Sequence, residues 1–222
     1  ISASHYPCEY NGIKFFNSDG YKLSDGIENE IENYILGEKA IEELPTHGKV
    51  GYVSANHNAV EDYVAFAVST IDCRLDGMKI AVDCANGASY ETAFKALNKL
   101  GANVEAIHNT PDGVNINHMC GSTHMESLQA YVTSIGADIG IAFDGDADRM
   151  LAVDENGNLI DGDQIMAACA KFMRDNGTLK QNTLVATVMS NLGLFMAGEK
   201  IGINIPRTKV GDRYVLEEML AK

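Results

Sequence analysis

The sequence has no tryptophan, only four prolines in 222 residues, and no apolar run near the roughly 18 residues that cross a bilayer. Its five cysteines are scattered and include no C-x-x-C pair, which argues against a disulfide framework and for reduced thiols in a cytoplasm. We expect no signal peptide at the start, because Ser2, Ser4 and His5 interrupt any apolar region there. The predicted location is therefore cytoplasmic, with no membrane partner.

Basic residues are also scarce. The chain has 17 Lys and Arg against 31 Asp and Glu, a formal net charge of −14. Nucleic acid is excluded as a partner, since phosphate-backbone binding needs a basic surface. An acidic chain can still bind a phosphorylated small molecule where a metal ion and a few placed Lys or Arg supply positive charge.

The order of the predicted elements indicates an α/β fold. Strands and helices alternate from Met78 onward, and Gly101 and Gly136 stand where helices commonly end. This alternation is typical of layered α/β domains with a mainly parallel sheet. We expect strands at 13–16, 139–143 and 183–189, and helices at 24–36, 60–71, 163–174 and 192–199.

The strongest chemical signal is the segment IAFDGDADRM. Asp144, Asp146 and Asp148 alternate directly after a predicted buried strand, where open α/β sheets place their sites. Three neighbouring carboxylates repel one another unless a cation neutralises them, and hard oxygen ligands favour Mg²⁺ over zinc. The segment therefore predicts a Mg²⁺ site.

Two other interpretations of this loop need weighing. An EF-hand also alternates Asp residues, but its sixth position should be Gly and here is Arg149, and the predicted flanks are strands. A phosphatase with an aspartyl nucleophile also places D-x-D after a strand, so Asp144 could attack phosphorus directly. The third Asp and the adjacent Arg fit a metal clamp better, with the nucleophile supplied by another segment. The opening loop offers Ser4 and Lys14 for such roles, although each alone is a weak signal.

Taken together, the segments resemble a known family. ISASHYP…NGIKFF, VDCANGA and FDGDADR resemble the phosphoserine loop, the second-domain entry strand and the metal loop of the α-D-phosphohexomutases. GVNIN (113–117), MSNLGL (189–194) and KVGDRYV (209–215) are similar to its hexosamine-specific branch. The resemblance implies three-layer αβα domains with a mainly parallel mixed sheet. It divides the chain into 1–57 (end of domain one plus connector), 58–179 (domain two) and 180–222 (start of domain three), an internal piece of a longer protein.

The resemblance also implies an activity. The family branch interconverts glucosamine 6-phosphate and glucosamine 1-phosphate with Mg²⁺, through a phosphoserine and a sugar bisphosphate, for UDP-N-acetylglucosamine and cell-wall precursors. The expected partner is a phosphorylated hexosamine. The resemblance assigns the site residues as follows: Ser4 carries the phosphate, Lys14 is the general acid/base, His5 and Arg149 lie beside the phosphoryl group, Arg213 binds substrate, and Ser4, Asp144, Asp146 and Asp148 hold the metal.

Some features leave alternatives open. The family loop usually reads S-H-N-P, but Tyr6 replaces its Asn, so the phenol either disturbs the loop or points outward. A phosphomannomutase or phosphoglucomutase relative, or a catalytically silent metal-binding piece, would share most of these motifs. The set His108, His118, Cys120 and His124 matches no common zinc spacing, so we predict no zinc site there.

Overall fold

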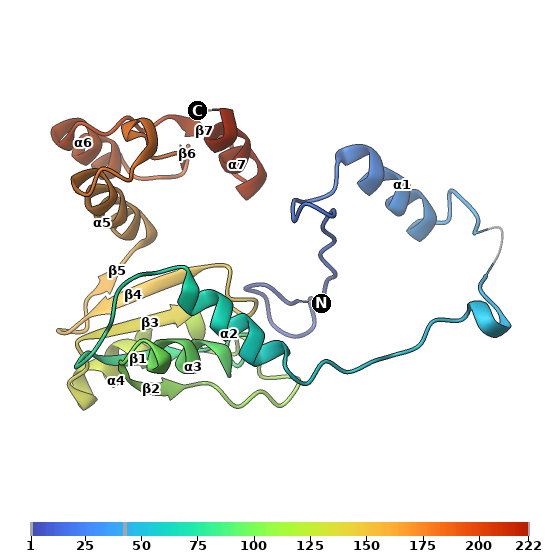
Figure 1. The fold of residues 1–222 in the computed structure, drawn as a ribbon, viewed down its shortest axis with the longest axis horizontal. Helices are drawn as coiled ribbons and strands as arrows, with labels where there is room; N and C mark the ends of the chain where they lie inside the picture. Colours follow the sequence, from blue (N-terminus) through green and yellow to red (C-terminus); the bar gives the residue numbers. More distant parts are fainter. Residues whose placement is uncertain (1, 42–43, 222) are drawn as a thin grey trace.

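The computed structural model describes residues 2–41 and 44–221. Two limits of the predicted units, Ile1 and Lys222, lie outside the described residues. Figure 1 shows an opening segment with helix α1 (Asp25–Ile35), a central sheet flanked by helices, and a C-terminal part that begins at α5 (Gly162–Asp175). In that view, the opening segment begins beside the central sheet, passes α7 (Asp212–Ala221) before it reaches α1, and then runs away from both.

The central sheet has five strands in the order β2-β1-β3-β4-β5. Strands β1 (Lys79–Asp83), β2 (Asn103–Ile107) and β3 (Ile139–Phe143) are parallel, so their carboxyl ends meet at one edge. Strands β4 (Met150–Asp154) and β5 (Leu159–Ile160) add an antiparallel extension. The predicted α/β class with a mixed, mainly parallel sheet is confirmed.

Helices cover both faces of this sheet, which gives three layers. Helix α4 (Glu126–Ile135) packs on one face, where Leu128 and Val132 are fully buried against β1, β3 and β4. Helix α3 (Thr92–Lys99) packs on the other face, with α2 (Ala59–Ser69) outside it. Burying each large apolar side chain contributes about 2 kcal/mol, so these two cores fix the register that aligns the strand ends.

The C-terminal part is built on α5, which a capping box of Asp161 and Gln164 begins. Helix α5 lies within the second predicted unit (58–179) and packs against β4 of that unit. It also packs against α6 (Leu192–Ile201), which belongs to the third predicted unit. Beyond it lie the parallel pair β6 (Ala186–Thr187) and β7 (Arg207–Thr208), and then α7. Short 3-10 helices span His47–Lys49, Gly121–Thr123 and Lys180–Asn182.

Two strand predictions are corrected. Residues 13–16 form no strand; the described part of the opening segment has only the bridges Ser2–Gly12 and Phe16–Lys22. No described strand pairs with residues 13–16, and their apolar side chains remain exposed. Within the described residues, the predicted strand 183–189 is reduced to β6, which pairs with β7 over two residues, and a separate bridge between Thr183 and Asn204. The predicted helices are confirmed within about two residues, and no described helix is long and apolar enough to span a membrane.

Candidate active site

The acidic loop follows β3 at the edge where the parallel strands end. Asp144 begins the loop, and its carboxylate Oδ1 accepts the backbone N–H of Arg149 at 3.2 Å. The N–H of Ala147 donates to the Asp144 carbonyl at 3.0 Å, which closes the turn. As a result, carboxylate oxygens of Asp144, Asp146 and Asp148 lie within 4.8 Å of one another.

The electrostatics of this loop suit a cation. Asp144 is fully buried, and burial raises the pKa of its carboxyl. Its Oδ2 and Oδ1 of Asp146 are buried with no hydrogen-bond partner in the described part of the chain. Buried carboxylate oxygens without partners are costly, and a metal ion with oxygen ligands would satisfy them. The three side chains therefore fit a hard divalent cation.

Lys14 now supplies positive charge to the loop. Its Nζ contacts the Asp146 carboxylate and lies 3.1 Å from Asp148 Oδ2. Burial acts to raise the pKa of Asp146, but the hydrogen bonds from Lys14 and Ser2 and the positive charge of Lys14 together outweigh it, and the net pKa is lowered. The same hydrogen bond to Asp146 raises the pKa of Lys14. The Lys14 ammonium would therefore compete with a metal ion for the carboxylates of Asp146 and Asp148.

The opening loop is bonded directly to the acidic loop. The Gly145 N–H donates to the Ser4 carbonyl at 3.0 Å. The side-chain amide of Asn117 donates to the carbonyls of Ser4 and Tyr6, both at 2.8 Å. Ser4 itself has a positive φ of 51°, a conformation that costs a non-glycine residue about 1 kcal/mol. Two of these hydrogen bonds end on the Ser4 carbonyl and one ends on the Tyr6 carbonyl. Together they hold Ser4 beside the carboxylates.

His5 and Arg149 complete the predicted group around Ser4. The Ser4 hydroxyl lies 3.4 Å from His5 Nδ1, and Nη1 of Arg149 lies 3.2 Å from the same nitrogen. In the tautomer with Nδ1 unprotonated, this nitrogen accepts from both groups. The Tyr6 ring is half exposed and stacks between His5 and Tyr10, with centroid distances of 4.2 and 5.7 Å. The Tyr6 ring thus packs on His5 while about half of the residue faces solvent.

Two glycines allow the loops after β1 and β3 to touch. A Cβ at Gly87 would overlap the carbonyl oxygen of Gly145. A Cβ at Gly145 would lie 2.5 Å from the Ser4 carbonyl oxygen and 2.6 Å from the Asn117 amide nitrogen. The Ala88 N–H donates to the Gly145 carbonyl at 2.8 Å. The main chains of the two loops are therefore in direct contact, and a residue with a Cβ does not fit at Gly87 or Gly145.

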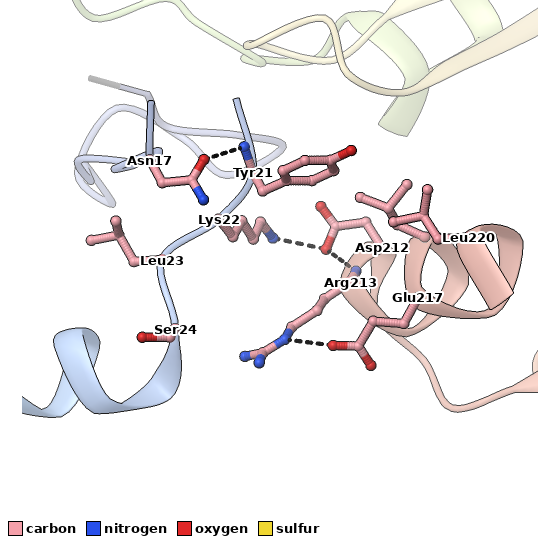
Figure 2. Close-up of a pocket in the computed structure, with 10 residues that line it drawn as sticks. Asn17, Tyr21, Lys22, Leu23, Ser24, Asp212, Arg213, Glu217 and Leu220 are labelled. Carbon is pink, nitrogen blue, oxygen red and sulfur yellow. Dashed lines mark hydrogen bonds and ion pairs between the residues drawn. The ribbon is translucent and has the colours of Figure 1, made fainter. Parts of the chain in front are cut away.

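Arg213 is the one predicted site residue that lies apart from this group. It lines a pocket of about 430 Å³ between residues 17–24 and α7 (Figure 2). Its guanidinium contacts Asp25. It also lies 3.1 Å from Glu217 Oε1, and beside it Lys22 pairs with Asp212 at 2.8 Å (Figure 2). Substrate binding through Arg213 would have to displace these carboxylates.

Sequence reasoning missed two features near the site. No role was predicted for Asn117, because hydrogen bonds across 113 residues leave no local spacing signal. His108 and Cys120 were set aside, yet the fold brings both within 4.8 Å of Asp83, which no spacing pattern included. Within the described ranges, His118 and His124 do not join this group.

Comparison with protein families gives three consecutive matches. Models described as "Phosphoglucomutase/phosphomannomutase, alpha/beta/alpha domain" I, II and III match residues 1–42, 59–157 and 161–222. The matches cover almost the whole chain in the order expected from the sequence motifs. The exact limits predicted for the three units stay a prediction.

Individual relatives extend this finding. The chain is 59% identical over 222 residues to a phosphoglucosamine mutase of Ruminiclostridium cellulolyticum, and 59% identical over 220 residues to one of Clostridium acetobutylicum. These alignments cover 100% and 99% of the chain but 49% of each relative, so the chain spans about half the length of the curated relatives it matches. A phosphoglucomutase/phosphomannomutase family protein of Burkholderia thailandensis superposes with a TM-score of 0.78 at 24% identity, over 100% of this chain and 46% of that one. That last similarity concerns the fold alone.

Proposed function

Since the chain belongs to the phosphoglucomutase/phosphomannomutase family, we propose that it is the serine- and metal-binding part of a cytoplasmic phosphoglucosamine mutase. Relatives that carry this name and are 54–59% identical over the chain support the choice. The observation that carries the proposal is the pair of hydrogen bonds that ties Ser4 to the segments beside the acidic loop, from Gly145 N–H and from the Asn117 amide. All five cysteines are free, which agrees with a reducing compartment.

The acidic loop is the proposed Mg²⁺ site. Asp144, Asp146 and Asp148, together with a phosphate on Ser4, would hold the ion, which supplies positive charge against the phosphoryl group in transfer. The three side chains offer carboxylate oxygens as ligands, which Mg²⁺ prefers. Binding would release Lys14 from two of the carboxylates it now contacts.

The proposed reaction has two phosphoryl transfers, one from Ser4 to the sugar and one from the sugar back to Ser4. The bond from phosphorus to the Ser4 oxygen breaks as a bond from phosphorus to a sugar hydroxyl oxygen forms, and the hydroxyl proton passes to a base. Lys14, once free of the carboxylates, is the proposed acid/base, and it returns a proton to Ser4 Oγ. The resulting bisphosphate then gives its other phosphoryl group back to Ser4. His5 and Arg149 lie beside Ser4 Oγ and would stabilise the phosphoryl oxygens.

The substrate is a phosphorylated hexosamine in this proposal. Arg213 would bind its non-reacting phosphate, once the guanidinium leaves Asp25 and Glu217. A family member specific for mannose or glucose phosphates is the rival function. Comparing turnover of the glucosamine, glucose and mannose phosphates separates the two.

The decisive experiment uses the complete protein that contains this chain. It should convert glucosamine 6-phosphate to glucosamine 1-phosphate with Mg²⁺ and a bisphosphate primer, and mass spectrometry should place phosphate on Ser4. Ser4→Ala should abolish turnover, whereas in Ser2→Ala, which lacks the hydroxyl that accepts the Ser4 N–H at 2.8 Å, the phosphate should still be found on Ser4. Phosphate on Ser2, or an active Ser4→Ala enzyme, would overturn the assignment.

The metal assignment has its own test on the 222-residue chain. Calorimetry should detect Mg²⁺ binding that Asp146→Asn weakens sharply, while Asp76→Asn, an exposed partner of Arg74, leaves it unchanged. Identical isotherms for the chain and Asp146→Asn would refute the site. We also expect no mutase turnover from this chain alone, because it spans about half the length of its relatives and its candidate phosphate anchor is occupied by carboxylates.

A further inference from the structure

A second cluster of ligand-type side chains lies at the same sheet edge, apart from the acidic loop. Asp83 is the last residue of β1, and His108 directly follows β2, the parallel neighbour whose Ile107 is in register with Asp83. Cys120 stands just before the 3-10 helix at Gly121–Thr123. One ligand atom from each of the three side chains lies within 4.8 Å of the others.

These groups are buried and their charge is weakly compensated. Asp83 and Cys120 are fully buried, and the His108 side chain is 32% exposed. Asp83 Oδ2 lies 2.9 Å from His108 Nδ1, while Oδ1 accepts the Ala85 N–H at 2.9 Å. Within residues 2–41 and 44–221, no Lys or Arg forms an ion pair with Asp83. A buried carboxylate with so little countercharge favours a cation beside it.

We propose that Asp83, His108 and Cys120 form a second metal site that takes a borderline divalent ion of the Zn²⁺ type. One oxygen, one nitrogen and one sulfur ligand suit zinc, whereas Mg²⁺ does not bind thiolate. Tetrahedral zinc places such ligand atoms ~3.4–3.6 Å apart, so side-chain shifts of about 1 Å suffice. A thiolate and a carboxylate also neutralise the charge of the ion inside the protein.

Neighbouring groups already orient two of these ligands. The Ala85 N–H holds the Asp83 carboxylate, and the Asn86 amide nitrogen lies 3.9 Å from Cys120 Sγ. Such outer partners are typical of metal sites, where they fix the direction of the ligand atoms. The partly exposed ring of His108 leaves one side of the cluster open, where water can occupy the fourth position.

The ion would join three chain segments that lie behind the Ser4 loop. The Asn86 N–H donates to the His108 carbonyl at 2.6 Å, and the Asn117 N–H donates to the Ala85 carbonyl at 2.9 Å. The side chain of Asn117 in turn binds the carbonyls of Ser4 and Tyr6. The role of the ion is therefore structural: it clamps the segment that presents Asn117. This inference does not depend on the proposed mutase activity.

The test is cobalt spectroscopy on the 222-residue chain, reduced and freed of metal. Co²⁺ should produce a thiolate-to-cobalt charge-transfer band that saturates at one ion per chain and disappears when Zn²⁺ is added. Cys120→Ser should remove the band, while Cys169→Ser, which changes an exposed cysteine, should retain it. His108→Ala should weaken Co²⁺ binding at least about tenfold.

Two controls keep the outcome interpretable. Asp146→Asn should retain the band, because the acidic loop contributes no sulfur; this separates the site from the Mg²⁺ site. Circular dichroism reports whether each variant folds, and if Cys120→Ser does not fold, His108→Ala, whose ring is partly exposed, decides in its place. Absence of the band from the unmodified chain overturns the proposal. So does a band that survives in folded Cys120→Ser, or full-strength binding by folded His108→Ala.

Discussion

The replacement Asn117→Asp tests how the Ser4 loop is held. The two side chains have nearly the same shape, and Asp tolerates the positive φ of 56° at this position. The change replaces the NH₂ group, which donates to the carbonyls of Ser4 and Tyr6, with an oxygen that cannot donate when ionised. Packing is preserved, so the effect comes from the lost hydrogen bonds and from the repulsion between the new carboxylate and the two carbonyl oxygens.

The magnitude follows from the two bonds. Each hydrogen bond contributes about 1 kcal/mol, and facing a carboxylate with two carbonyl oxygens adds a penalty of about 1–2 kcal/mol. The expected loss is about 3–4 kcal/mol in the free energy that docks residues 2–10 onto the sheet edge. At 1.4 kcal/mol per factor of ten, opening of this segment becomes about 140 to 700 times more frequent.

Native-state hydrogen exchange measures this opening. The reporter is the Gly145 amide, which donates to the Ser4 carbonyl, and its exchange should accelerate by the stated factor. Asn17→Asp is the matched control, because Asn17 uses only its oxygen, which accepts from Asp19 and Tyr21 N–H and is retained in Asp. Equal Gly145 exchange in Asn117→Asp and in the unchanged chain would refute the reasoning.

Three further predictions concern charge, thiols and the core. Lys14→Met should strengthen Mg²⁺ binding about two- to fivefold by calorimetry, because a half-exposed ion pair worth up to ~1 kcal/mol no longer competes; weaker binding would contradict this. Burial raises the pKa of Cys84 and Cys120 to about 11, so in the metal-free chain both stay protonated at pH 8, and mass spectrometry after alkylation should find them unmodified until the chain unfolds. Leu128→Ala should lower the free energy of unfolding by about 2–5 kcal/mol in urea titrations, whereas the exposed Leu36→Ala should change it little.

The sequence predicted best the features that depend on neighbouring residues. The Asp144–Asp148 spacing after a buried strand places the three carboxylates together through local turn geometry, and the fold keeps them so. Gly136 ends α4 in the left-handed conformation, as its position suggested. Signals of this kind need no knowledge of the distant chain.

Features that depend on distant partners were not predictable in this way. Residues 13–16, three of which are apolar, have the composition of a strand, but a strand also needs a paired neighbour, and residues 2–41 supply only isolated bridges. The roles of Asn117 and Asp83 arise from contacts across 113 and 25 residues. Such contacts form only once the sheet aligns the ends of β1, β2 and β3, so a single sequence contains no local trace of them.

The contact between Gly87 and Gly145 has a consequence for how this protein can vary. Since a side chain at either position would collide with main-chain atoms, no neighbouring side chain can be trimmed to make room. A saturation library should therefore tolerate almost nothing at either position, and second-site suppressors should be absent. Other positions of the loops after β1 and β3 can accept substitutions, but these two glycines, and the contact between the two loops, should not change.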